Sequence, residues 1–187
     1  MLGGNIFSYA LDYKESNRLM SFAHDLGCRA VDTADVYSKG TSERIIGKSL
    51  KAKRKEWFIA TKVGVSTNEK IYLVNSKQNI FDRVEASLER LKTDYIDLYQ
   101  LHHFDRTVKI EETLDALEKL REQGKILNYG VSNFQPKHFQ NFPTNNRYQK
   151  EIYSNQVHFN IVNRNAEFLY KDLLEETEMK LIAYNIL

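Results

Sequence analysis

The chain has 187 residues, of which 42% are hydrophobic and 28% are charged, a composition typical of one folded domain. Its 27 basic and 25 acidic residues are interspersed and leave a net charge of +2, which argues against a nucleic-acid-binding surface. One cysteine, Cys28, excludes an internal disulfide, and no apolar run reaches the roughly 20 residues of a membrane helix. The N-terminus also lacks the basic and apolar regions of a signal peptide, so we expect a cytoplasmic protein that binds neither membrane nor nucleic acid.

Short runs rich in apolar and β-branched residues recur along the chain and predict strands. They are RAVDTADV (29–36), WFIATKV (57–63), YIDLYQL (95–101), ILNYGVS (126–132), NQVHFNIV (155–162) and KLIAYNIL (180–187). The opening segment MLGGNIFS (1–8) has the character of a further strand that precedes them.

Segments with helical periodicity separate most of these strands. The predicted helices are SNRLMSFAHDLG (16–27), SKQNIFDRVEASLERLK (76–92), IEETLDALEKLREQGK (110–125) and AEFLYKDLLEETEMK (166–180), each with apolar residues three or four positions apart. Ser76 is the expected N-cap of the second helix, and Gly124 is the expected stop of the third. Strands and helices alternate at intervals of roughly 25 to 37 residues, which predicts βαβ units and a parallel sheet.

Two parallel architectures compete, an open doubly wound sheet and a (β/α)8 barrel. A nucleotide-binding open sheet would have a glycine-rich G-x-G-x-x-G turn after its first strand, and LGGNIFS lacks that spacing. Polar residues instead mark the carboxyl end of one predicted strand after another, where a barrel places its active site. These residues are Asp32, Lys62, His102, Ser132, Asn133 and Tyr184. The pattern favours the barrel.

The polar residues of the first strands have the chemistry of a proton-donating site. A phenol such as Tyr37 has a reference pKa near 10, which a neighbouring ammonium lowers. Lys62 supplies the ammonium, and Asp32 supplies the carboxylate that a buried ammonium needs. With His102 to orient a carbonyl oxygen, the group is suited to protonating a C=O bond while a nucleophile such as hydride arrives from elsewhere.

Each of these residues also has a purely structural interpretation. Taken singly, a lysine at a strand end, a histidine beside an apolar run or a tyrosine above a sheet is more often a packing or surface residue. His102 and His103 make a poor metal site, because neighbours on a strand point to opposite faces. It is the placement on successive strand ends that favours a functional site.

The segment YGVSNF allows two interpretations as well. Ser132 and Asn133 could cap a tight turn, or their hydroxyl and amide groups could hold a planar carboxamide by complementary hydrogen bonds. Gln156, from the following strand, would add another such group. A carboxamide is the substituent of a nicotinamide ring, which would make nicotinamide the hydride donor.

At this point the sequence resembles the aldo-keto reductases over nearly its whole length. The ordered motifs that support the resemblance are GCRAVDTADVYSKGTSERIIGKSL, FIATKVG, SLERLKTDYIDLYQLHHFD, GKILNYGVSNF, NQVHFNIVNRNAE and LIAYNIL. The resemblance implies a (β/α)8 TIM barrel that binds NADPH (NADP⁺) without a Rossmann fold and reduces a small-molecule aldehyde or ketone.

The resemblance also assigns roles to individual residues. It implies a catalytic tetrad in which Tyr37 donates the proton, Lys62 paired with Asp32 depresses the pKa of Tyr37, and His102 orients the substrate. His102 is preferred over His103 because it is the first histidine after DLYQL. The implied cofactor-binding residues are Ser132, Asn133 and Gln156 on the carboxamide and Tyr184 stacked under the nicotinamide ring, together with Asn185 and Leu187.

Compared with members of the family that it resembles, the chain is expected to be truncated. We expect a single aldo-keto-reductase-like domain over residues 1–187 with about seven βα units, lacking the N-terminal hairpin and the C-terminal region of helix and eighth strand. Two alternatives remain open: a non-catalytic barrel relative that acts as a binding or regulatory subunit, and an inactive fragment. The sequence predicts no metal site, and it fixes neither the substrate, the choice of NADPH over NADH, nor the oligomeric state.

Overall fold

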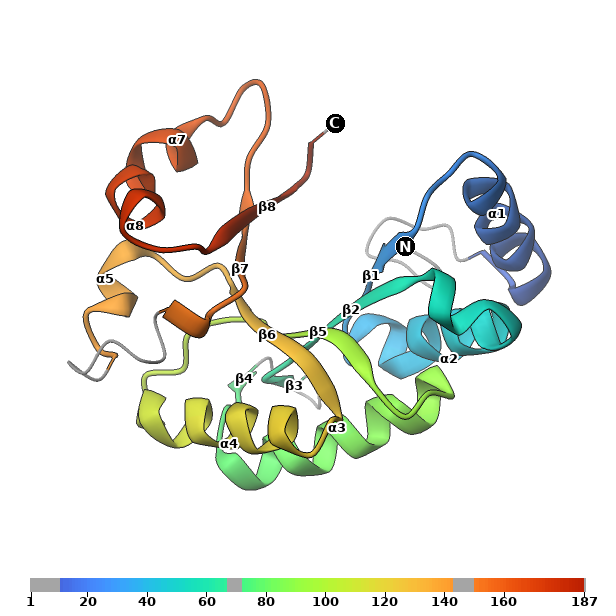
Figure 1. Cartoon of the computed structure of the whole chain (residues 1–187), viewed down its shortest axis with the longest axis horizontal. Coiled ribbons are helices and arrows are strands. Elements are labelled where there is room, and N and C mark those ends of the chain that lie inside the picture. The colour runs from blue at the N-terminus through green and yellow to red at the C-terminus, as the bar shows by residue number, and fades with distance from the viewer. Residues whose placement is uncertain (1–10, 67–71, 143–149, 187) are drawn as a thin grey trace.

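The structure is a computed structural model that describes residues 11–66, 72–142 and 150–186 (Figure 1). Its main sheet contains β1 (Ala30–Asp32), β2 (Phe58–Val63), β5 (Ile96–Leu101), β6 (Ile126–Ser132), β7 (Ser154–His158) and β8 (Lys180–Tyr184). All neighbouring strands are parallel, and their spatial order follows their order in the chain. In a doubly wound sheet, later strands are added on both sides of the first strand, so the strand order does not follow the chain. The sequential order found here therefore confirms the predicted barrel topology.

The six-stranded sheet curls into a half-barrel, and its helices lie on the outer side (Figure 1). They are α1 (Tyr13–Asp25), α2 (Thr41–Leu50), α3 (Lys77–Leu91), α4 (Ile110–Glu122), α5 (Pro136–Phe139), α7 (Asn165–Leu169) and α8 (Lys171–Glu176), with 3₁₀ segments η1 (Tyr37–Gly40) and η2 (Lys51–Glu56). All six predicted strands between residues 29 and 187 are present. The further strand predicted within residues 1–8 lies outside the described residues.

The predicted helix ends are found, with one difference in how they are held. Ser76 occupies the N-cap position of α3, but its side chain makes no capping hydrogen bond. Gly124 follows α4 with φ of 71°, the left-handed conformation in which glycine ends a helix without strain. Helix α1 has a capping box that the sequence analysis did not identify, in which Asp12 and Glu15 each accept a hydrogen bond from the other's backbone N–H.

Two local features differ from the sequence-based expectation. The helix predicted over 166–180 is divided into α7 and α8 at Tyr170, whose backbone has φ of −108° and ψ of 3°. The buried Tyr170 hydroxyl donates to Phe134 O at 2.8 Å, so a long-range contact fixes the break. A short antiparallel pair, β3 (Val65–Ser66) and β4 (Tyr72–Leu73), lies between β2 and α3 and was not predicted.

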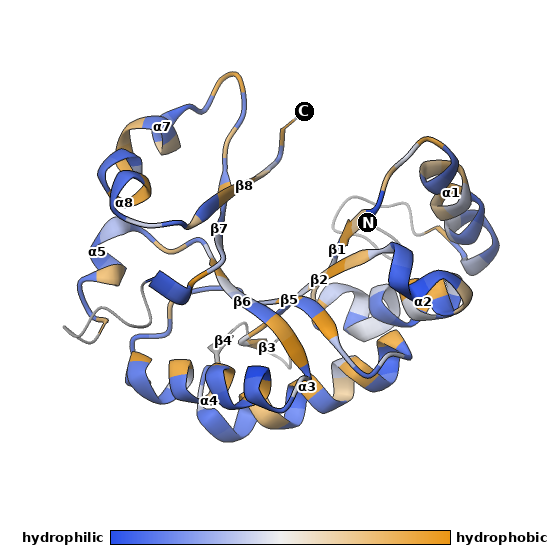
Figure 2. Ribbon diagram, viewed as in Figure 1, coloured by the Kyte–Doolittle hydropathy of each residue, from blue (hydrophilic) through white to orange (hydrophobic). Residues whose placement is uncertain are grey.

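The core lies between the convex side of the sheet and the apolar faces of the helices. Helix α3 buries Ile80, Val84, Leu88 and Leu91, and α4 buries Leu114, Leu117 and Leu120, which are the positions that the helical periodicity selects. Figure 2 shows hydrophobic residues along the strands and hydrophilic residues on the outward surface of α4. This outer packing leaves the carboxyl ends of the strands free for polar groups.

Helices α2 and α3 approach so closely at Gly47 that we expect Gly47→Ala to destabilise the fold. A Cβ atom at this position would lie 2.4 Å from the carbonyl carbon and oxygen of Leu91. Alanine would gain up to about 1 kcal/mol of helix propensity, whereas overpacking against rigid backbone costs about 1–3 kcal/mol. We expect a net loss of about 1 kcal/mol in the free energy of unfolding, measured by urea denaturation.

The control for this measurement is Arg44→Ala, an exposed change on the same helix that should alter the free energy of unfolding by no more than about 0.5 kcal/mol. If Gly47→Ala were as stable as the unmodified chain, the close approach of α2 and α3 would be wrong.

Candidate active site

The register of the sheet aligns the predicted site residues in one row at the carboxyl ends of the strands. Lys62 pairs with Gln100, Gln100 with Gly130, Ser132 with Gln156, and His158 with Tyr184. Residues paired in register point to the same face of a sheet, and residues two positions apart on one strand also share a face. The register therefore brings Lys62, His102, Ser132, Gln156 and Tyr184 to one face.

A buried lysine and a partly exposed aspartate form the ion pair at the base of this site. Lys62 Nζ donates to Asp32 Oδ2 at 2.6 Å and to Thr33 O at 2.8 Å. The Lys62 side chain is only 1% exposed, whereas that of Asp32 is 40% exposed. Burial lowers the pKa of Lys62, while Asp32, by its charge and hydrogen bond, opposes that shift.

Tyr37 lies beside this pair at the start of η1, in the segment that follows β1. Its ring centre is 5.3 Å from Lys62 Nζ. The ring meets His102 edge to face, with centroids 5.9 Å apart. The structure therefore brings together the four residues predicted as a tetrad: Asp32, Tyr37, Lys62 and His102.

The prediction that Lys62 depresses the pKa of Tyr37 is wrong for this structure. Burial raises the pKa of Tyr37 to about 12, and the negative charge of Asp32 and the neighbouring Tyr184 raise it further. The Lys62 ammonium is hydrogen-bonded to Asp32 and Thr33, and the negative charge of Asp32 offsets its effect on the pKa of the phenol. Tyr37 is consequently a protonated phenol at neutral pH.

His102 is a neutral imidazole in this environment. Burial lowers its pKa to about 3, and the positive charge of Lys62 contributes in the same direction. Its Nδ1 atom is buried and has no hydrogen-bond partner in the described part of the chain. The ring stacks on that of His103, with centroids 5.3 Å apart.

The predicted carboxamide-binding residues form a second group on β6, β7 and β8. Asn133 Nδ2 donates to His102 O and to Ser132 Oγ, each at 3.1 Å, and the Tyr184 hydroxyl donates to Asn133 Oδ1 at 2.9 Å. Asn133 has φ of 60°, a left-handed conformation that asparagine tolerates well. Among the hydrogen bonds of the described residues, none involves the side chain of the buried Gln156.

The two C-terminal members of the predicted cofactor-binding set are Asn185 and Leu187. Asn185 is exposed, and its carbonyl oxygen accepts a hydrogen bond from Asn160 Nδ2 at 2.9 Å. Leu187 lies outside the described residues. Their predicted contacts with a cofactor therefore stay predictions.

Gln100 is a site residue that the sequence analysis missed. It is fully buried on β5, and its Nε2 lies 3.5 Å from Asp32 Oδ1. Its Oε1 is buried without a hydrogen-bond partner among the described residues. Strand periodicity could have identified it, because Gln100 precedes His102 by two positions and so shares its face.

A second missed feature is the ion pair between Asp35 and Arg83. It anchors residues 33–37, which lead from β1 to Tyr37 and are called the tyrosine segment below, to α3. Arg83 Nη1 donates to Asp35 Oδ2 at 2.6 Å and to Val65 O at 2.9 Å. Burial raises the pKa of Asp35 to about 6, although Arg83 acts against this rise. No sequence pattern connects residues 35 and 83, because the contact depends on how α3 docks.

Neither a metal-ligand cluster nor a membrane-spanning helix is found within residues 11–66, 72–142 and 150–186. No cluster of three or more histidine, cysteine, aspartate or glutamate side chains there could hold a metal ion. In the same ranges, no helix combines the length and apolar character needed to cross a bilayer.

Comparison with known proteins identifies the family to which this geometry belongs. A sequence profile described as "Aldo/keto reductase family" matches residues 1–187. The aldo-keto reductase YhdN of Bacillus subtilis (strain 168) is 34% identical over 189 residues, covering 100% of this chain and 56% of YhdN. The methylglyoxal reductase YeaE of Escherichia coli (strain K12) is 35% identical over 165 residues, covering 86% of this chain and 54% of YeaE. The chain belongs to the aldo/keto reductase family.

A solved aldo/keto reductase supports the same conclusion at the level of the fold. The enzyme from Klebsiella pneumoniae, in complex with NADP and acetate, superposes with a TM-score of 0.84 at 25% identity, covering 98% of this chain and 62% of that one. The half-barrel described above is thus part of an aldo/keto reductase barrel. The chain spans about half the length of the curated relatives it matches.

The unequal exposure of Lys62 and Asp32 predicts unequal effects of removing either partner. In Asp32→Asn the buried Lys62 ammonium loses its charge partner, which should lower the free energy of unfolding by about 3 kcal/mol. In Lys62→Met the remaining carboxylate can be solvated, so the loss should be no more than about 1 kcal/mol. Urea denaturation of both variants at pH 7 tests the difference.

The pH dependence of the Asp32→Asn variant provides a control. The pKa of Lys62 in the folded variant would lie below its unfolded value of about 10.4. The unfolded state then binds more protons, so stability should rise as the pH rises towards that value. Equal losses in the two variants, or no rise with pH, would contradict the burial of this ammonium.

Proposed function

We propose that this chain contains the proton-transfer site of an NADPH-dependent reductase that converts an aldehyde or ketone to an alcohol. The observation that supports this most directly is the convergence of Asp32, Tyr37, Lys62 and His102 at the carboxyl ends of neighbouring strands. The proton donor is Tyr37, whose raised pKa keeps its hydroxyl protonated at neutral pH. We also propose a cytoplasmic location and one domain over residues 1–187.

The residues of β6 to β8 fit the nicotinamide end of the proposed cofactor. The Gln156 side chain has no hydrogen-bond partner among the described residues and can bind a carboxamide, and Ser132 and Asn133 supply the neighbouring hydroxyl and amide. When bound, a reduced nicotinamide supplies the hydride. The NADP complex of the Klebsiella relative supports this choice of cofactor.

In this proposal the remaining residues hold the proton and the substrate oxygen in place. The Lys62 ammonium, 5.3 Å from the centre of the Tyr37 ring, faces the phenolate that remains after the proton is donated. Asp32 fixes that ammonium at 2.6 Å. His102 is neutral, so it orients a carbonyl oxygen through a hydrogen bond and contributes no charge.

A second proposal is a barrel relative that binds a ligand without turnover. One observation favours it: the Lys62 ammonium is hydrogen-bonded to Asp32 and Thr33, and burial raises the pKa of Tyr37 to about 12. The two proposals differ in whether the purified chain oxidises NADPH when an aldehyde is present. A chain that binds NADPH in a calorimeter and reduces no aldehyde would favour the second.

We expect Tyr37→Phe to lower kcat for aldehyde reduction by at least about 100-fold, because it removes the proton donor. The dissociation constant for NADPH should change less than about twofold, since the ring is retained. NADPH oxidation with methylglyoxal and calorimetric titration measure the two quantities. Tyr13→Phe, a change on the exposed face of α1, is the matched control. Undiminished turnover by Tyr37→Phe would exclude Tyr37 as the acid.

The pKa values of the site predict how the reaction depends on pH. With the pKa of Tyr37 near 12 and that of His102 near 3, neither should titrate between about pH 7 and 9. We expect kcat/KM for reduction to be flat across that range in steady-state assays. Below about pH 6 we expect kcat/KM to fall, because Asp35 becomes protonated there and its ion pair with Arg83 is lost. This fall should be absent from the pH profile of Asp35→Asn. A limb near pH 6.5 that persisted in that variant would point to a titrating His102.

A further inference from the structure

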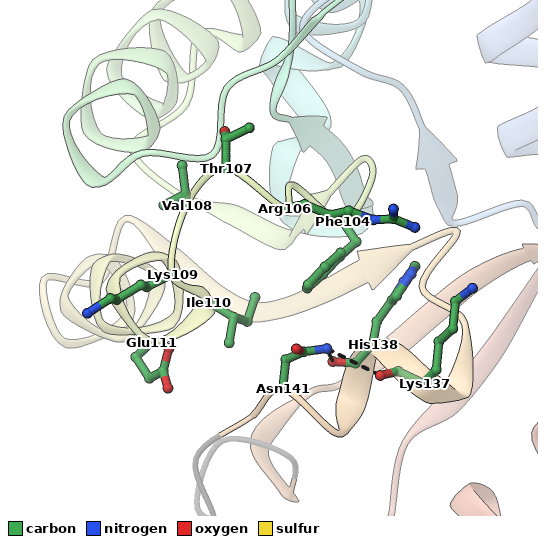
Figure 3. Close-up of a pocket in the computed structure, with 10 residues that line it drawn as sticks. All are labelled: Phe104, Arg106, Thr107, Val108, Lys109, Ile110, Glu111, Lys137, His138 and Asn141. Carbon is green, nitrogen blue, oxygen red and sulfur yellow. Dashed lines mark hydrogen bonds between the residues drawn. The ribbon is translucent and has the colours of Figure 1, made fainter.

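A pocket outside the proposed tetrad opens between the β5–α4 loop and α5 (Figure 3). It has a volume of about 790 Å³, and its lining includes Phe104, Arg106, Lys137 and His138. The β5–α4 loop forms one wall of the pocket and begins next to the tetrad, because Phe104 is two residues beyond His102. The proposed function above does not use this pocket.

Positive charge gathers on one side of the pocket. Figure 3 shows the tips of Arg106, Lys137 and His138 close to one another, whereas the Lys109 ammonium points away from them. Neither Arg106 nor Lys137 forms an ion pair with another described residue. Burial lowers the pKa of His138, and the nearby charges of Lys137 and Arg106 lower it further, so the three groups are close enough to interact electrostatically. Glu111 is the carboxylate among the lining residues.

The acidic residue beside Arg106 in the chain is already engaged elsewhere. Asp105 is buried, and its Oδ1 accepts hydrogen bonds from the Thr107 backbone N–H at 2.9 Å and hydroxyl at 2.6 Å. Its Oδ2 accepts from Asn75 N at 3.1 Å. These bonds fix the loop that presents Arg106, and no carboxylate of the described residues pairs with its guanidinium.

The same side of the pocket has a flat aromatic wall and a directed N–H donor. The rings of Phe104 and His138 stack with centroids 4.3 Å apart and an angle of 13° between their planes. His138 Nδ1 accepts a hydrogen bond from Gln135 N at 3.1 Å. In the neutral ring the proton therefore resides on Nε2, which can donate to a ligand.

We propose that this pocket binds the carboxylate or phosphate of a small anion with a planar body, with Arg106 and Lys137 on the negative charge and Phe104 against the plane. An oxyanion matches a guanidinium and an ammonium that form no ion pair within the described part of the chain, and charge-assisted hydrogen bonds to such groups are the stronger ones. Because Phe104 also packs on Phe134 at 5.4 Å, the pocket adjoins the strand ends of both His102 and Asn133.

The proposal extends to the substrate class, and in that part it rests on the proposed reductase function. An anionic group held by Arg106 and Lys137 would select carbonyl compounds that also bear a carboxylate or phosphate over neutral ones of the same shape. Selection of this kind acts on binding, so it should appear in KM rather than in kcat.

The first experiment measures binding alone and needs no catalytic activity. Benzoate, benzamide and inorganic phosphate are titrated into the purified chain at low ionic strength and followed by calorimetry. We expect benzoate to bind more tightly than neutral benzamide, and Arg106→Gln and Lys137→Gln each to weaken benzoate about tenfold. Lys171→Gln, an exposed change on α8, is the control.

The outcomes of this titration decide the inference. Phosphate that binds as well as benzoate would assign the site to the charge alone and would overturn the planar part of the proposal. Equal binding of benzoate and benzamide, or benzoate binding that neither variant weakens, would overturn it entirely.

The second experiment compares reduction of 4-formylbenzoate and 4-methylbenzaldehyde by the chain and by Arg106→Gln. We expect the variant to raise KM for the charged aldehyde about tenfold and to leave the neutral aldehyde unchanged. Equal effects on both aldehydes would overturn the assignment of substrate class. No turnover of either aldehyde, with benzoate binding intact, would overturn the reductase proposal and leave the anion site standing.

Discussion

A buried ammonium is costly unless a carboxylate compensates it, and in this fold that requirement links the first two strands of the described sheet. Lys62 extends from β2 and is 1% exposed, so Asp32 must be within hydrogen-bond distance at the end of β1. The parallel pairing of Asp32 with Ala60 sets that distance. Thr33 continues the pairing through its N–H to Ala60 O and accepts from Lys62, so the segment leading to Tyr37 departs from a fixed point.

Helix α3 extends this arrangement outward through two more buried carboxylates. Arg83 binds Asp35 at 2.6 Å, and Arg90 binds the fully buried Glu43 of α2 at 2.6 Å. Glu43 also accepts from Thr61, the neighbour of Lys62 on β2. The tyrosine segment is therefore held by the sheet on one side and by α3 on the other, and the orientation of Tyr37 depends on helix docking as much as on its own loop.

The sequence predicts those parts of the structure that depend on local patterns. Periodicity predicts α3 and α4, and polar residues at strand ends predict the meeting of Asp32, Lys62 and His102. It does not predict the break at Tyr170, which depends on a hydrogen bond to Phe134 36 residues away. The direction of the Tyr37 pKa could not be predicted either, because burial outweighs the charge of Lys62 only once the side chains are packed.

The predicted carboxamide-binding residues on β6 to β8 can contribute only a small part of the binding free energy of the cofactor. Asn133 Oδ1 already accepts from the Tyr184 hydroxyl, and Asn133 Nδ2 already donates to Ser132 and His102. A carboxamide that binds Asn133 competes with these bonds, and exchanging one hydrogen bond for another yields little net free energy. The amide of Gln156 is the exception, because its side chain has no hydrogen bond to another described residue. These residues therefore orient the nicotinamide more than they retain it, and tight binding must come from contacts with the rest of the dinucleotide.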